Sequence, residues 1–107
     1  MKISNQIYTY IYRWKIKNGK SDDFINSWKN ITDYYLEHHN SLGSRLHYIG
    51  QNEYIAYANW PNKEARNIAF NSNNDKIKID GKMMKDAILK SYDIIQSSLI
   101  SDKLRFN

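Results

Sequence analysis

The clearest pattern in the sequence is an alternation of side chains over residues 6–17. Apolar residues, most of them aromatic, occupy every second position, at Tyr8, Tyr10, Tyr12, Trp14 and Ile16. A period of two built from aromatic and β-branched residues is typical of a strand with one face against the core. The intervening positions are apolar at one end and charged at the other. We therefore expect the second face of this strand to be partly covered as well.

Residues 21–38 change to a helical period. Asn18-Gly19-Lys20 predicts a turn, after which Ser21 is expected to cap the N-terminus of a helix. Apolar side chains then recur at spacings of three and four, at Phe24, Trp28, Ile31 and Tyr35. Such spacing places them on one stripe of a helix that packs against a core.

A hairpin and a short helix are predicted next. Residues 44–50 and 54–60 have the composition of strands, and residues 51–53 would connect them as a hairpin. Pro61 stops the second strand, and Pro61 or Asn62 is expected to open a short helix through Glu64, Ala65, Ile68 and Ala69.

The C-terminal third of the chain has a weaker pattern. Residues 71–75 are rich in asparagine and predict a loop, whereas residues 76–80 alternate lysine with isoleucine and leave helix and strand both open. Residues 81–92 are predicted to be helical. Residues 94–104 are rich enough in leucine and β-branched side chains for a closing strand.

The predicted order of elements is that of a split βαβ, or ferredoxin-like, α+β domain spanning residues 1–107. Right-handed crossovers then place the first and third strands at the centre of a four-stranded antiparallel sheet, with the helices on one face. Four apolar side chains would project from the other face, namely Ile7, Ile11, Ile55 and Tyr57. Because these are too apolar to leave in water, we expect two sheets to pack face to face in a homodimer.

Composition narrows the classes of function. Aromatic residues make up 14% of the chain, including nine tyrosines and three tryptophans, and such residues suit cores and ligand pockets. The absence of cysteine excludes disulfides, thiolate nucleophiles and iron–sulfur clusters. The adjacent His38 and His39 would point in different directions on a helix, so no metal site is expected.

Charge and hydropathy bear on location and partners. The net charge is +5, but the basic residues are spread along the chain, so nucleic acid is not an expected partner. No stretch approaches the roughly 20 apolar residues that span a bilayer, and residues 1–12 have no apolar run of the signal-peptide type. We therefore expect a cytoplasmic protein without membrane contact.

Three segments carry a resemblance to a known family. They are WKIKNGK (residues 14–20), LGSRLH (residues 42–47) and YIAYANWP (residues 54–61). Together they resemble the antibiotic biosynthesis monooxygenase superfamily, the dimeric α/β barrels, over nearly the whole chain. The resemblance implies that two ferredoxin-like domains pair as a dimeric α/β barrel. The family includes cofactor-independent oxygenases that oxidise aromatic polyketides to quinones, and haem-degrading enzymes.

The family's functional positions are matched only in part. Trp60 matches the tryptophan that closes the third strand in the family. The quinone-forming branch has an asparagine where this chain has Ala56, and a helix tyrosine where it has Arg66. The haem-degrading branch has an asparagine where this chain has Tyr12, and a helix histidine, whereas no histidine follows His47. The known catalytic sets are therefore absent, and no cofactor is expected.

Two functions follow from this comparison. The first is a cofactor-independent oxygenase that acts on an aromatic or apolar compound. The alternative is a non-catalytic dimeric module that binds a small molecule or has a regulatory role. An RNA-binding domain shares the topology, but its motif needs a glycine and a basic residue on the third strand, and residues 54–60 contain neither.

The candidate binding site lies on the helix-facing side of the sheet. There, large aromatic residues of the first strand neighbour small residues of the third, an arrangement that gives either tight packing or an apolar cavity. The candidate ligand-binding residues are Tyr10, Tyr12, Trp14, Trp28, Ala56, Ala58 and Trp60.

Two further residues are candidates for catalysis. If Gln51 pairs with Tyr54, then Arg45 and His47 face the same side of the sheet as the candidate binding site. His47 would act as general base, and Arg45 would hold an anion or enolate. A change of one residue in the register would send both side chains to the opposite face.

Overall fold

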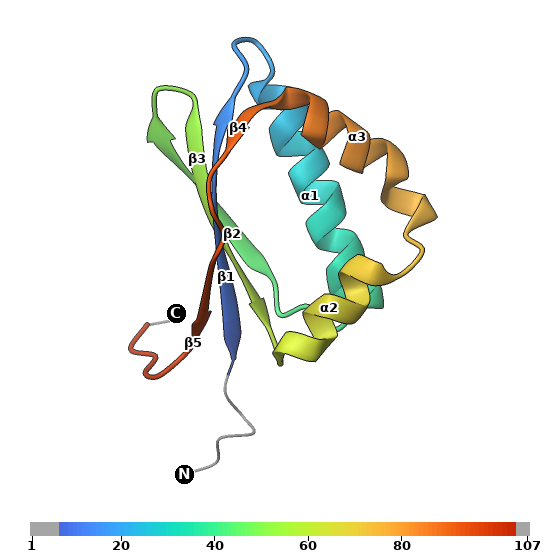
Figure 1. Cartoon of the computed structure of the whole chain (residues 1–107), viewed down its shortest axis with the longest axis vertical. Coiled ribbons are helices and arrows are strands. Elements are labelled where there is room, and N and C mark those ends of the chain that lie inside the picture. Colours follow the sequence, from blue (N-terminus) through green and yellow to red (C-terminus); the bar gives the residue numbers. More distant parts are fainter. Residues whose placement is uncertain (1–6, 105–107) are drawn as a thin grey trace.

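The computed structural model describes residues 7–104 and contains both strands and helices. The elements are β1 (Tyr8–Ile16), α1 (Ser21–His38), β2 (Ser44–Gly50), β3 (Glu53–Trp60), α2 (Lys63–Asn71), the short 3-10 helix η2 (Asp75–Ile77), α3 (Lys78–Ala87), β4 (Ile88–Ser91) and β5 (Ile95–Ser98). Helices α1, α2 and α3 cover one face of the sheet (Figure 1). This arrangement confirms the ferredoxin-like α+β prediction.

The sheet is antiparallel, with strand order β2-β3-β1-β4, and β5 also pairs with β1. Strands β1 and β3 lie side by side at its centre, as predicted. The sheet has five strands and not the expected four, because two short strands share one edge of β1. Strand β4 pairs with the end of β1 around Trp14 to Ile16, and β5 pairs with its beginning, Tyr8 to Ile11.

The alternation in β1 has the predicted effect on burial. Tyr10, Trp14 and Ile16 are buried on the helix-facing side, whereas Arg13 is exposed on the other side. The predicted strand began at residue 6, which lies outside the described residues. The first strand therefore places its large aromatic side chains between the sheet and the helices.

The start of helix α1 differs by one residue from the prediction. Lys20 occupies the N-cap position and Ser21 is already the first helical residue, with no side-chain hydrogen bond capping the helix. The Lys20 carbonyl still accepts from the Phe24 amide at 3.0 Å, so the first turn is closed by the backbone. The predicted end of this helix at about His38 is confirmed.

Residues 88–92 are not helical, which corrects the prediction of a helix over residues 81–92. Helix α3 begins earlier, at Lys78, and ends at Ala87. Residues 88–91 then form β4 because the free edge of β1 offers backbone partners, and pairing there overrides the local helical period. The predicted closing strand over residues 94–104 is confirmed only for residues 95–98.

The hairpin between β2 and β3 contains an irregularity that sets the facing of β2. Gln51 and Asn52 form the turn, both with positive φ, and Gly50 pairs with Glu53. The register then shifts, so that Tyr48 pairs with Tyr54. A β-bulge of this kind reverses which side chains of the strand face the helices.

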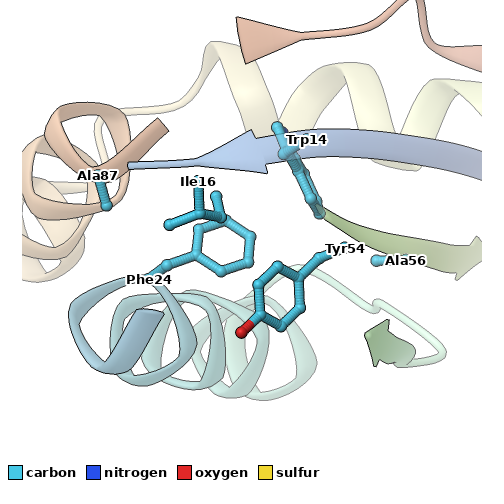
Figure 2. Close-up of a cluster of buried hydrophobic side chains, with 6 residues drawn as sticks. All are labelled: Trp14, Ile16, Phe24, Tyr54, Ala56 and Ala87. Atoms are coloured by element: carbon cyan, nitrogen blue, oxygen red, sulfur yellow. The ribbon is translucent and has the colours of Figure 1, made fainter. Parts of the chain in front are cut away.

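The core consists of two buried clusters along the helix-facing side of the sheet. One contains Trp14, Ile16, Phe24, Tyr54, Ala56 and Ala87, and the other contains Tyr10, Trp60 and Ala69. Figure 2 shows the first cluster, in which the Phe24 ring projects from α1 toward Ile16 and Tyr54. The rings of Trp14 and Phe24 meet edge to face with centroids 5.2 Å apart, a favourable aromatic geometry.

Candidate functional site

A cavity of about 360 Å³ lies between the sheet and the three α-helices. Aromatic side chains form much of its wall, among them Tyr12, Trp14, Trp28, Tyr35, Trp60 and Phe70. The other lining residues are Ile31, Thr32, Ser41, Ser44, Ala58, Met84, Ser91, Tyr92 and Ile94. A largely apolar cavity of this volume with a few polar groups has the character of a small-molecule site.

Five of the seven predicted ligand-binding residues line this cavity. They are Tyr12, Trp14, Trp28, Ala58 and Trp60. The other two, Tyr10 and Ala56, are buried in the two core clusters and do not line the cavity. At both positions the sheet packs directly against other side chains. The large and small residues fit together there, and the cavity lies at other positions along the sheet.

One region of the cavity wall is polar. The Tyr12 hydroxyl, from β1, accepts a hydrogen bond from Nη2 of Arg66, on α2, at 3.4 Å. The guanidinium of Arg66 also lies 4.5 Å from the Tyr10 ring centre and 4.0 Å from that of Phe70. Burial raises the pKa of the Tyr35 hydroxyl, and nearby Tyr12 raises it further while Arg66 lowers it. Tyr35 is therefore a neutral hydrogen-bond donor at neutral pH.

The predicted catalytic pair does not reach the cavity. Arg45 pairs with Tyr57 and His47 pairs with Ile55, so both side chains lie on the face of the sheet away from the helices. His47 Nε2 is 3.1 Å from the Tyr57 hydroxyl there, and both predicted residues are exposed. The bulge after Tyr48 is the cause, because an uninterrupted register from Gly50–Glu53 would have turned both side chains toward the helices.

No protein-family model and no curated protein match the sequence. Solved structures do resemble the chain over most of its length. A candidate antibiotic biosynthesis monooxygenase from Chloroflexus aurantiacus superposes with a TM-score of 0.75 and 9% identity, covering 90% of this chain and 95% of that one. SnoaB, a cofactor-independent oxygenase from Streptomyces nogalater, gives a TM-score of 0.72 and 11% identity, covering 92% and 96%. A conserved protein from Methanosarcina mazei superposes with a TM-score of 0.73 and 14% identity, covering 88% of this chain and 93% of that one.

The chain has the fold of the antibiotic biosynthesis monooxygenases. At identities of 9% and 11%, the likeness establishes the fold and leaves the activity to be argued from the site. Within this antibiotic biosynthesis monooxygenase fold, Trp60 ends the central strand β3 and lines the cavity.

Several cavity residues were not proposed from the sequence. Tyr35 and Ile31 lay on the predicted apolar stripe of α1, so the signal for them was present. Phe70, which lines the cavity, and Arg66, which bonds to Tyr12, both come from α2, and their positions depend on how that short helix docks. Local spacing carries no information about that docking.

The opposite face of the sheet has its own charged network. Glu53 accepts from Arg13 Nε at 2.8 Å and from the Tyr92 hydroxyl at 3.1 Å. The bond from Arg13 holds the pKa of Glu53 below its usual value, and the bond from Tyr92 acts in the same direction. The Arg13 guanidinium also lies 4.4 Å from the centre of the Tyr92 ring. These contacts tie the end of β4 to the centre of the sheet.

Two further structural findings concern residues 7–104. Within that range, no group of three histidine, aspartate or glutamate side chains is placed to hold a metal ion. None of the helices in the same range is long and apolar enough to cross a membrane.

Proposed function

We propose that the protein binds an aromatic or otherwise apolar small molecule in the cavity between its sheet and its helices. The observation that carries this proposal is the cavity itself, about 360 Å³ in volume and walled largely by aromatic rings. Sites of a few hundred cubic ångströms with this lining bind compact ring systems by burying most of their surface. The hydroxyls of Tyr12 and Tyr35 would orient the ligand.

A second candidate function is oxidation of that ligand by dioxygen without a cofactor. It is supported by the fold shared with SnoaB, which is a cofactor-independent oxygenase. In such a reaction a ring CH₂ becomes C=O and the second oxygen atom leaves as water. Among the described residues that line the cavity there is no carboxylate and no imidazole. The substrate would therefore have to ionise readily, and the protein would contribute by holding its anion away from water.

Ligand binding can be tested directly because all three tryptophans of the chain line the cavity. We expect 1,4-dihydroxyanthraquinone to quench their emission saturably, with one site per chain. Replacing Ala58 with leucine should weaken this binding, because the added carbons occupy the cavity. Ile55→Leu, on the other face of the same strand, should bind as the original chain does. Equal binding by both variants, or no saturable quenching at all, would contradict the proposal.

Oxidation can be tested with anthrone as substrate, in an oxygen electrode. One O₂ should be consumed for each anthrone converted to anthraquinone and water. A rate above the uncatalysed one that Ala58→Leu lowers would support the oxygenase. Saturable binding without faster oxygen uptake would instead favour the non-catalytic binding module.

We also propose that two copies of the chain pair through the uncovered sheet face. Ile7, Ile11, Ile55 and Tyr57 are only partly buried within one chain, and Ile95 beside them is 58% exposed. A sheet face that carries a group of partly exposed apolar side chains is commonly covered by a partner. A second copy placed on a two-fold axis would match it with the same apolar face.

A further inference from the structure

The polar region of the cavity wall carries two tyrosine hydroxyl groups, and a guanidinium is bonded to one of them. Tyr12 and Tyr35 both line the cavity, from β1 and α1 respectively. Arg66 sits behind them on α2, bonded to the Tyr12 hydroxyl oxygen. Tyr35 stacks on Phe70 with ring centroids 5.3 Å apart, and Arg66 lies against the same Phe70 ring. Three elements thus bring these groups together at one end of the cavity.

The positive charge of Arg66 has no acidic partner within the described residues. The ion pairs formed over residues 7–104 involve other side chains, and none includes Arg66. Its Nε–H group is buried without a hydrogen-bond partner. Contact with two aromatic rings offsets part of the cost of this partly buried cation. A guanidinium left in this state favours an anion nearby.

The hydrogen bond from Arg66 also decides what Tyr12 can offer. Because the hydroxyl oxygen accepts from Nη2, the hydroxyl proton of Tyr12 remains available for donation. Because the group that donates to Tyr12 is a cation, the Tyr12 hydroxyl also becomes a stronger hydrogen-bond donor. Burial raises the pKa of the Tyr35 hydroxyl, so Tyr35 is a hydrogen-bond donor at neutral pH. This end of the cavity therefore offers donors and a positive charge.

We propose that this end of the cavity binds an anionic oxygen carried by the aromatic ligand, with Tyr12 and Tyr35 donating hydrogen bonds and Arg66 supplying the charge. The inference rests on the proposed ligand-binding function and narrows its ligand to aromatic oxyanions, that is, phenolates and carboxylates. If the ligand is a substrate, the same groups would stabilise its ionised form, which is the electron-rich form that can react with dioxygen.

The test compares naphthalene, 2-naphthol and 2-naphthoate, which share one ring system and differ in the oxygen they carry. The original chain should bind 2-naphthoate about tenfold or more tightly than naphthalene, the value of one hydrogen bond to a charged group. Bound 2-naphthol should ionise at lower pH than free 2-naphthol, which the absorbance of the naphtholate reports. If bound naphthol ionises at lower pH but naphthoate is not preferred over naphthalene, the site is a phenolate site. If naphthoate is preferred but the ionisation of naphthol is unchanged, the site is a carboxylate site.

Two variants locate the effect, each with a matched control. Tyr12→Phe and Arg66→Gln should each lose about tenfold in affinity for the preferred oxyanion and leave naphthalene binding unchanged. Tyr54→Phe removes a tyrosine hydroxyl that is not on the cavity wall, and Lys63→Gln removes an exposed positive charge from the same helix. Both controls should bind as the original chain does. Tyr12→Phe preserves the ring, so it keeps the test valid if Arg66→Gln does not fold.

The outcomes separate this inference from the proposed function. If all three ligands bind equally well, the cavity is a ligand site and the oxyanion inference is overturned. The inference is equally overturned if the preference for an oxyanion survives in Tyr12→Phe. If none of the ligands binds, the proposed function fails and the inference fails with it.

Discussion

Trp60 belongs both to the core and to the cavity wall. Its side chain is 2% exposed and packs with Tyr10 and Ala69. The Tyr35 ring lies 5.8 Å away, centroid to centroid, on the side of the cavity. Its Nε1–H is buried and has no hydrogen-bond partner in the part of the chain that the structure describes. The stability contributed by Trp60 therefore comes from packing of the ring.

Replacing Trp60 with alanine should destabilise the protein by about 3–5 kcal/mol, the usual cost of truncating a buried tryptophan. For a chain of this size the melting temperature should fall by roughly 10 °C or more. Trp60→Phe should cost less than about 1.5 kcal/mol, because it keeps an aromatic ring and removes an N–H that lacks a partner. Thermal unfolding followed by circular dichroism measures both. An unchanged melting temperature for Trp60→Ala would show that the third strand is misplaced.

Helix α2 illustrates how one element positions the site. The Asn62 side chain caps it, accepting from the Ala65 amide at 2.8 Å. The helix then presents Arg66 to Tyr12, and Phe70 to the cavity. The helix has only nine residues, so its stability depends strongly on its cap and its packing.

Asn62→Ala should lower the free energy of unfolding by about 1 kcal/mol, because one amide of the first turn loses its acceptor. Asn62→Asp keeps the acceptor and should be close to the original chain in stability. Urea denaturation compares the two. An unchanged stability in Asn62→Ala, or equal losses in both variants, would contradict the role of the side-chain acceptor. Ligand binding should weaken in Asn62→Ala if fraying of α2 displaces Arg66.

At the scale of the whole molecule, the two faces of the sheet have different surroundings. The helices cover one face (Figure 1). The cavity lies between this face and the helices. The other face carries partly buried isoleucines beside the charged cluster of Arg13 and Glu53. An apolar area bordered by charges is the usual composition of a subunit interface.

The chain of 12.8 kDa should therefore sediment and scatter light as a dimer. Ile55→Lys, in the middle of the uncovered face, should shift the mass toward the monomer, because a buried unpaired charge is costly. Ile79→Lys, at an exposed position on α3, should leave the dimer intact. A monomeric mass for the original chain at micromolar concentration would contradict the proposed pairing.

Much of the fold follows from local patterns in the sequence. The alternation from Tyr8 to Ile16 identifies β1, and the apolar stripe from Phe24 to Tyr35 identifies α1, because each period matches the geometry of one element. The same patterns predict most of the cavity wall contributed by these two elements. Trp60 could also be identified as a buried residue at the end of a strand.

The tertiary structure decided what local patterns leave open. Residues 88–91 form a strand because β1 has a free edge, which is a long-range property. Arg45 and His47 face away from the cavity because a single bulge reverses the facing of β2. Arg66 reaches Tyr12 only through the docking of α2. Sequence periods determine which face of an element is apolar. Register, edge pairing and docking depend on partners distant in the chain, and these decided where the cavity and Arg66 lie.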